Sequence, residues 1–181
     1  MFVGGAALVY TEVGRVAERV RMWLDPWSDA DGGGYQTIQS IYAIANGHFG
    51  GTGFGQGTFT DADGNQLIPY VSTDFIYSAL AQELGLVGIS AFLLVYMLFA
   101  ARGFRIAMLA QDGFSKLLAV GLTFCFVLQT FIIVGGIVRI IPLTGITLPF
   151  VSYGGSSIVA NFVLLAGLLL VSNRANERLG T

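Results

Sequence analysis

Residues 68–101 read IPYVSTDFIYSALAQELGLVGISAFLLVYMLFAA, a short polar segment followed by a long apolar run that ends at Arg102. From Phe75 to Ala101 there are about 27 residues at 1.5 Å each, roughly 40 Å of helix, which exceeds the hydrocarbon thickness of a bilayer. The run therefore predicts a membrane-spanning helix. It also places Asp74 at a membrane surface, where a carboxylate is well placed to act on a molecule lying there.

The composition as a whole is that of an integral membrane protein. Hydrophobic residues make up 54% and charged residues only 11%, and the mean hydropathy is +0.71. Soluble domains carry about a quarter charged residues. The net charge of −2, with Lys116 as the single lysine, excludes a basic patch for nucleic acid. The only cysteine, Cys125, excludes a disulfide framework and a thiolate metal site.

Three apolar runs predict an all-α, polytopic membrane protein with spans at 74–101, 117–139 and 156–172. The first residues, MFVGGAALVY, are too short for a span and lack the basic region of a signal peptide. We therefore expect a C-terminal fragment of a longer membrane protein. The remaining segments are expected to be the end of a truncated helix at 1–10, a large loop at 11–73, loops at 102–116 and 140–155, and a tail at 173–181.

Basic residues orient these spans. The 102–116 loop and the 173–181 tail lie on one side and together hold Arg102, Arg105, Lys116, Arg174 and Arg178. The positive-inside rule places them in the cytoplasm. The 11–73 and 140–155 loops are then extracytoplasmic, which brings Asp74 and Arg139 to the outer face.

The large loop contains two patterned segments. Residues 11–22 alternate arginines, among them Arg19, with apolar positions, as in an amphipathic helix at a membrane interface; their arginines can equally reach lipid headgroups without binding a ligand. A short helix is expected to start at Tyr35. The glycine-rich run at 47–57 suits close packing or ligand binding through backbone N–H groups, but it lacks the spacing of a nucleotide-binding loop.

Two acids have competing interpretations. Asp74, after Ser72 and Thr73, is either a helix cap or a functional acid. Glu83 lies about 13 Å into the expected span and half a turn out of phase with Asp74, so the two do not form a carboxylate pair on a straight helix. For Glu83 we expect a structural role, as a buried hydrogen bond to another helix at Gln129 or Asn161.

Four blocks together resemble one family. WLDPWSDADGGGYQTIQSIYAIANGHFGGTGFGQG, IPYVSTDFIYSALAQELGLVG, RGFRIA and IPLTGITLPFVSYGGSS, in this order, resemble the C-terminal part of the SEDS family, the RodA, FtsW and SpoVE proteins of bacterial cell-wall synthesis. QTFIIVGGIVRIIPLTG and SIVANF resemble actinobacterial RodA more than FtsW. The resemblance implies a helical bundle of about ten spans, of which this chain supplies the last three and the large extracytoplasmic loop.

The resemblance also implies a function. Family members polymerise lipid II into glycan strands at the outer face of the bacterial plasma membrane, for elongation, shape or division, beside a class B penicillin-binding protein. The essential aspartate of the family's TDF motif matches Asp74, an arginine before the family's DP turn matches Arg19, and the GYQxxQS block holds Gln39 and Ser40.

The chemistry implied by the resemblance needs a base for the acceptor hydroxyl and positive charge for the leaving pyrophosphate. Asp74 is the expected base. Candidates for binding the substrate are Arg19 and Arg139, the serines Ser152 and Ser156 of the SYGGSS stretch, and a divalent cation such as Mg or Mn. A lipid II flippase and a non-catalytic scaffold for a transpeptidase remain alternatives. The fragment alone is expected to be inactive.

Overall fold

The computed structural model describes residues 14, 16–60, 67–68 and 71–179. The predicted helix end at 1–10 lies outside the described residues. The elements in this part of the chain are helices, and the all-α prediction is confirmed. They are a helix over residues 16–24, η1 (Pro26–Asp29), α2 (Tyr35–Asn46), α3 (Ile76–Leu109), α4 (Gly113–Ile137) and α5 (Gly155–Leu179).

Three of these helices are long and apolar enough to cross a membrane: α3, α4 and α5 up to Asn176. They confirm the multi-pass membrane protein expected from the composition. The helices extend past the predicted spans at several ends, most clearly α3, which continues to Leu109. The points at which a bilayer surface crosses the helices stay a prediction.

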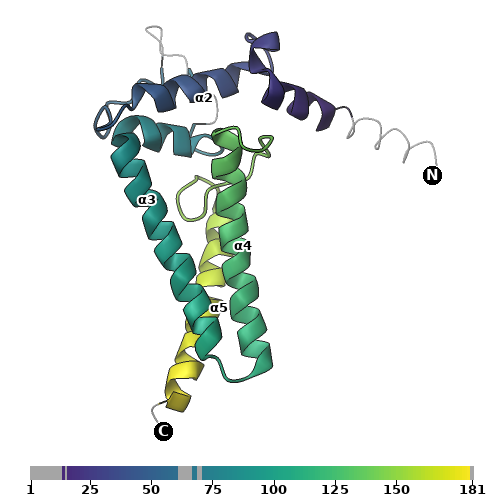
Figure 1. The fold of residues 1–181 in the computed structure, drawn as a ribbon, viewed down its shortest axis with the longest axis vertical. Coiled ribbons are helices and arrows are strands. Elements are labelled where there is room, and N and C mark those ends of the chain that lie inside the picture. Colours follow the sequence, from purple (N-terminus) through teal and green to yellow (C-terminus); the bar gives the residue numbers. More distant parts are fainter. Residues whose placement is uncertain (1–13, 15, 61–66, 69–70, 180–181) are drawn as a thin grey trace, which may run out of the picture.

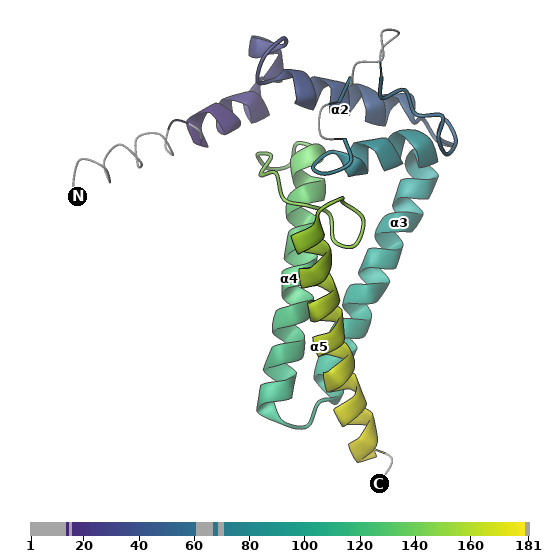
Figure 2. The same ribbon diagram turned by 180° about the vertical axis from the view of Figure 1, so that it is seen from behind.

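The helices form a bundle with one covered end. Figures 1 and 2 show α4, α5 and the long second part of α3 side by side, with α2 and helix 16–24 lying across one end. We call this the covered end. The opposite end, where α3 is joined to α4 and where α5 finishes, is the far end. The helix predicted to start at Tyr35 is confirmed as α2.

α3 is broken near its start. Gly85 has φ 68° and ψ −175°, a conformation that only glycine adopts readily. The glycine-rich loop bonds to the break: Thr52 N donates to Gln82 O, Gly53 N donates to Glu83 O, and Leu86 N donates to His48 O. In Figure 1 the part of α3 before the break lies across the covered end beneath α2. The glycine run therefore packs against helix backbone, as one of the two interpretations expected.

This break corrects two predictions about α3. The straight helix of roughly 40 Å is wrong, because the chain turns at Gly85 before it runs along α4. The depth of about 13 Å for Glu83 was calculated along this straight helix, whereas Glu83 precedes the break and belongs to the part that crosses the covered end. A glycine at 85 is required by space as well as by φ, because a Cβ there would collide with Gly51 N.

Two apolar cores hold the bundle. At the covered end, large side chains from α3, α4 and the connection after α4 are buried together, among them Phe75, Ile133 and Leu148. At the far end a second core includes Ala107 and Ala119. Only 17–22% of the most apolar window of each span is buried within the chain, so most of its apolar surface is left for lipid or for other spans.

Candidate functional site

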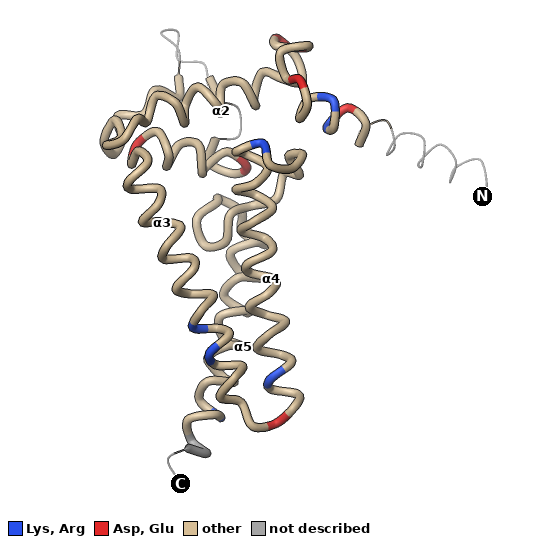
Figure 3. Tube along the Cα trace, in the orientation of Figure 1, with Lys and Arg blue, Asp and Glu red and all other residues tan. Residues whose placement is uncertain are grey.

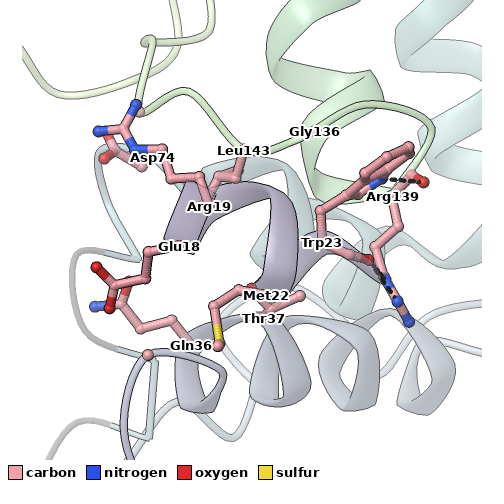
Figure 4. Close-up of a pocket in the computed structure, with 12 residues that line it drawn as sticks. Glu18, Arg19, Met22, Trp23, Gln36, Thr37, Asp74, Gly136, Arg139 and Leu143 are labelled. Atoms are coloured by element: carbon pink, nitrogen blue, oxygen red, sulfur yellow. Dashed lines mark hydrogen bonds between the residues drawn. The ribbon is translucent and has the colours of Figure 1, made fainter. Parts of the chain in front are cut away.

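A pocket of about 300 Å³ opens at the covered end, between helix 16–24, α2 and the α4–α5 connection (Figure 4). Asp74 lies in it, from the segment just before α3. The pocket brings together segments that are far apart in the sequence. Its lining residues are Glu18, Arg19, Met22, Trp23, Gly33, Gln36, Thr37, Asp74, Gly136, Arg139, Leu143 and Gly145.

Asp74 does not cap α3. The N-cap residue is Phe75, whose side chain makes no capping hydrogen bond. Asp74 is half-buried. A methyl group added at Gly145 would lie 3.3 Å from Asp74 Oδ2, so the carboxylate rests against the backbone of the α4–α5 connection. Asp74 is thus not the N-cap residue, and its half-buried carboxylate lines the pocket.

Arg19 shares the pocket with Asp74. It lies on helix 16–24, and Figure 4 shows its side chain extending toward Asp74. Glu18, beside it in the sequence, lines the same pocket. A guanidinium and a carboxylate at one opening give the site both signs of charge, as a reaction with a proton acceptor and an anionic leaving group needs.

Arg139 lines the pocket, but its guanidinium is turned away from Asp74 (Figure 4). Nη2 donates to Trp23 O at 2.7 Å and to Leu24 O at 3.1 Å. The group also lies 5.5 Å from the ring centroid of Trp27. Its positive charge is thus engaged with the end of helix 16–24, the negative end of that helix dipole.

The two predicted residues of α2 lie beside the pocket rather than in its lining. The Ser40 hydroxyl is buried and shares a hydrogen bond of 2.6 Å with the Ser78 hydroxyl, which joins α2 to α3. Gln39 is half-buried, and the α2 side chains that line the pocket are Gln36 and Thr37. The GYQxxQS block thus meets the pocket one turn earlier than the predicted pair.

The two predicted serines of the SYGGSS stretch, Ser152 and Ser156, have different surroundings. Ser152 is buried and donates to Thr73 O at 2.6 Å, which joins it to the residue before Asp74. Ser156 is exposed in the first turn of α5. Neither lines the pocket.

The predicted partners of Glu83 are wrong. Gln129 Nε2 donates to Thr147 O, and Asn161 Nδ2 donates to Ser157 O, so both amides hold the α4–α5 connection and the start of α5 instead. Glu83 does not line the pocket. Within the described ranges no three His, Cys, Asp or Glu side chains gather to hold a metal ion.

Several lining residues were missed by sequence reasoning. Glu18 had no signal beyond its place beside Arg19 in the amphipathic segment, whereas Leu143 and Gly145 lie in the IPLTGITLPFVSYGGSS block that carries the resemblance. Gln36 had a signal, since it belongs to the same GYQxxQS block as Gln39.

Similar proteins agree on one family. Residues 1–177 match the cell cycle protein family FtsW/RodA/SpoVE. Peptidoglycan glycosyltransferase RodA of Mycobacterium tuberculosis H37Rv is 46% identical over 181 residues, 100% of this chain and 37% of that protein. Stage V sporulation protein E of Bacillus subtilis is 40% identical over 155 residues, 86% of this chain and 41% of that protein.

A solved structure shares the fold. A chain of a peptidoglycan synthase complex, from work on how polymerization and crosslinking are coordinated, matches with a TM-score of 0.67 and 28% identity, over 97% of this chain and 49% of that one. The chain thus spans 37% of the length of its mycobacterial relatives and about half of this solved chain. The resemblance to actinobacterial RodA is borne out by the mycobacterial identity. The chain belongs to the FtsW/RodA/SpoVE family.

Proposed function

We propose that the full-length protein carrying this chain is a peptidoglycan glycosyltransferase that polymerises lipid II into glycan strands at the outer face of the plasma membrane. The observation that carries the proposal is the pocket at the covered end, where the half-buried Asp74 and the side chain of Arg19 face one opening. The names of the mycobacterial relatives support the same reaction.

In this reaction Asp74 is the general base. The acceptor sugar's 4-hydroxyl oxygen attacks the anomeric carbon of the donor, a new C–O bond forms, and the bond from that carbon to the lipid pyrophosphate breaks. The hydroxyl proton goes to the Asp74 carboxylate, and the electron pair leaves with the pyrophosphate. Arg19 stabilises the negative charge that develops on this leaving group.

The distribution of charge supports an extracytoplasmic pocket. Figure 3 shows basic residues at both ends, and those toward the far end belong to the segments that hold Arg102, Arg105 and Lys116. Those at the covered end lie on helix 16–24, within the long loop that the positive-inside rule does not count, and after α4. The positive-inside rule assigns the far end to the cytoplasm. The covered end with Asp74 then faces outward, the C-terminus is cytoplasmic, and a lipid-linked sugar can reach the pocket from the outer leaflet.

We also propose a partner, a class B penicillin-binding protein that crosslinks the new strands. The support is the solved relative, which comes from a peptidoglycan synthase complex. The three spans of this chain leave most of their apolar surface uncovered within it, which is surface that a partner span or the protein's other spans can occupy.

The test is polymerisation of purified lipid II by the protein at the full length its gene encodes, together with its partner. Asp74→Asn and Asp74→Ala are expected to lower the rate by about 100-fold or more, because a positioned general base contributes a factor of this size. Binding of lipid II is expected to remain. Gel analysis of labelled glycan strands measures the polymer.

Asp112→Asn is the matched control. Asp112 caps α4 at the far end, where its carboxylate accepts from Ser115 N, and asparagine can also cap a helix. Its activity is expected to equal the wild type. Full polymerisation by Asp74→Asn would contradict the proposal and favour a lipid II flippase or a scaffold for the transpeptidase, which transport assays in vesicles and transpeptidation assays would separate.

A further inference from the structure

The α4–α5 connection, residues 138–154, is bonded to both walls of the pocket. One wall is helix 16–24, which carries Arg19, and the other is the segment 72–75, which carries Asp74. Arg139 holds the first wall and Ser152 the second, through backbone atoms in each case. The connection is thus bonded to both segments that carry the charged residues of the pocket.

The contact of Arg139 with helix 16–24 is reciprocal. The guanidinium donates to Trp23 O through Nε at 3.3 Å and Nη2 at 2.7 Å, and Trp23 Nε1 donates back to Arg139 O at 2.8 Å. The guanidinium carbon of Arg139 also lies over the Trp27 ring, 5.5 Å from its centroid. Trp23 lies four residues after Arg19 on the same helix, so whatever fixes Trp23 also fixes the direction of Arg19.

Arg139 makes this contact from a strained, left-handed backbone conformation. Its φ is +63°, and it follows Val138, the C-cap residue of α4. Ile140 N donates to Gly135 O and Arg139 N donates to Gly136 O, the pattern of a helix end in which glycine is usual at this position. An L-residue such as arginine adopts this left-handed conformation less readily than glycine does. A strained residue with bonds to a distant helix points to a role for its side chain.

The second wall is held in the same way. The Ser152 hydroxyl accepts from Leu148 N at 2.8 Å and donates to Thr73 O at 2.6 Å. Tyr153 N donates to Ser72 O at 2.8 Å. Both bonds end on carbonyls of the two residues before Asp74, so they set the course of the backbone that enters it.

The connection is itself anchored inside the bundle. Gln129 Nε2 of α4 donates to Thr147 O at 2.8 Å, and the Thr147 hydroxyl is 2.6 Å from the Ser157 hydroxyl of α5. The Tyr96 hydroxyl of α3 donates to Pro149 O. Each of the three membrane helices therefore contributes a side chain to this segment, which makes it a fixed support for both walls.

We propose that Arg139 and Ser152 are positioning residues that set the separation and direction of Arg19 and Asp74, and that neither binds the substrate. The proposal rests on the polymerase function proposed above. It replaces the expectation that the Arg139 charge and the Ser152 hydroxyl contact lipid II. A positioning defect lowers kcat while the KM for lipid II changes little, whereas loss of a pyrophosphate ligand raises KM.

The Arg139 test compares Arg139→Gly and Arg139→Lys in the full-length protein with its partner. Glycine suits φ +63°, so this variant folds, and lysine keeps the charge but cannot reproduce the forked contact with Trp23 and Leu24. Both are expected to lower kcat for lipid II polymerisation by about tenfold or more, with KM within about twofold. Full activity in both variants, or a raised KM with lysine as active as arginine, would overturn the assignment.

A double-variant experiment with Trp27, which also contacts the Arg139 guanidinium, tests the same assignment. Trp27 is exposed on η1 and does not line the pocket. Trp27→Leu is expected to lower kcat when Arg139 is present and to have no further effect in the Arg139→Gly background, because the two act through one contact. Additive effects would mean that Arg139 acts elsewhere and would contradict the proposal.

Ser152→Ala tests the other wall, with Thr123→Val as its control. Thr123 is buried in α4, and its hydroxyl donates to the carbonyl of Ala119 within the same helix. Thr123→Val therefore removes a buried hydroxyl bond that does not reach the pocket, whereas Ser152→Ala removes the bonds with Leu148 N and Thr73 O. Ser152→Ala is expected to lower kcat by about tenfold with lipid II binding retained. Thr123→Val is expected to match the wild-type kcat. Equal kcat in both variants would overturn the role of Ser152.

A distance measurement tests the positioning role of Arg139 independently of the polymerase reaction. Spin labels on cysteines introduced at the exposed Ala17 and Ala91, with the native cysteines replaced, report how helix 16–24 sits over α3. Arg139→Gly is expected to broaden or shift the distance distribution. If wild-type protein makes no polymer, the polymerase proposal fails while this measurement still decides whether Arg139 holds the helix; an unchanged distribution would contradict the inference even in an active enzyme.

Discussion

The two ends of the bundle are held by different means. At the far end the helices touch directly through small residues: Gly103 lies against Thr123, and Ala107, Ala110 and Ala119 are buried. At the covered end, polar side chains bond backbone carbonyls, as Arg139 and Ser152 do. Close packing of small residues is the usual way in which membrane helices associate. The covered end departs from it where the pocket lies.

The far end serves as a structural support, whereas the covered end forms the pocket. Regular helices at the far end satisfy their own backbone groups and need only matching surfaces. The pocket needs chain segments that are not helical, and their free backbone groups must find partners, which the glycine-rich loop and the α4–α5 connection supply. The same substitution, glycine to alanine, should therefore have very different effects at the two ends.

The largest effect is expected for Gly85→Ala at the covered end. The φ of 68° with ψ −175° is unfavourable for alanine, and its Cβ would collide with the backbone at Gly51 N, which no side-chain movement relieves. We expect a loss of about 3 kcal/mol or more in unfolding free energy. Thermal unfolding of the full-length protein in detergent measures it. An unfolding temperature equal to the wild type would mean that α3 does not need its break.

A smaller effect is expected for Gly103→Ala at the far end. The three atoms nearest to the new Cβ all belong to the side chain of Thr123, so the clash is with a side chain rather than with backbone. Overpacking of this kind costs about 1–3 kcal/mol. Adding Thr123→Ala should restore part of the loss, and the kcat of the folded protein should stay at the wild-type value because no pocket residue lies there. Failure of the double variant to recover would show that the clash involves more than Thr123.

The far end and the helical parts could be predicted from the sequence. Long apolar runs find α3, α4 and α5 because a bilayer demands length and hydropathy, which are local properties. The covered end could be predicted only in part. The break at Gly85 depends on a loop more than 30 residues earlier, and a glycine inside an apolar run gives no sign of its φ.

The sequence identified which residues belong to the site but not which atoms they contact. Asp74 and Arg19 were found because motif resemblance singles them out, and they line one pocket. Arg139 was expected to offer its charge to a substrate, but its bonds reach Trp23, 116 positions away. The sequence shows that Arg139 is charged but not which carbonyl groups its guanidinium bonds. The position of Glu83 was misjudged because α3 was assumed to be straight.

The smallest effect is expected for Gly121→Ala in α4. Gly121 is exposed, and a Cβ there meets nothing within 4 Å in the described part of the chain. Alanine favours helix over glycine by up to about 1 kcal/mol, so the unfolding temperature of the full-length protein should stay the same or rise slightly. A fall comparable with that of Gly103→Ala would mean that another helix packs closely on Gly121 in the full-length protein. In that case the small-residue packing of the far end extends to a face of α4 that this chain leaves bare.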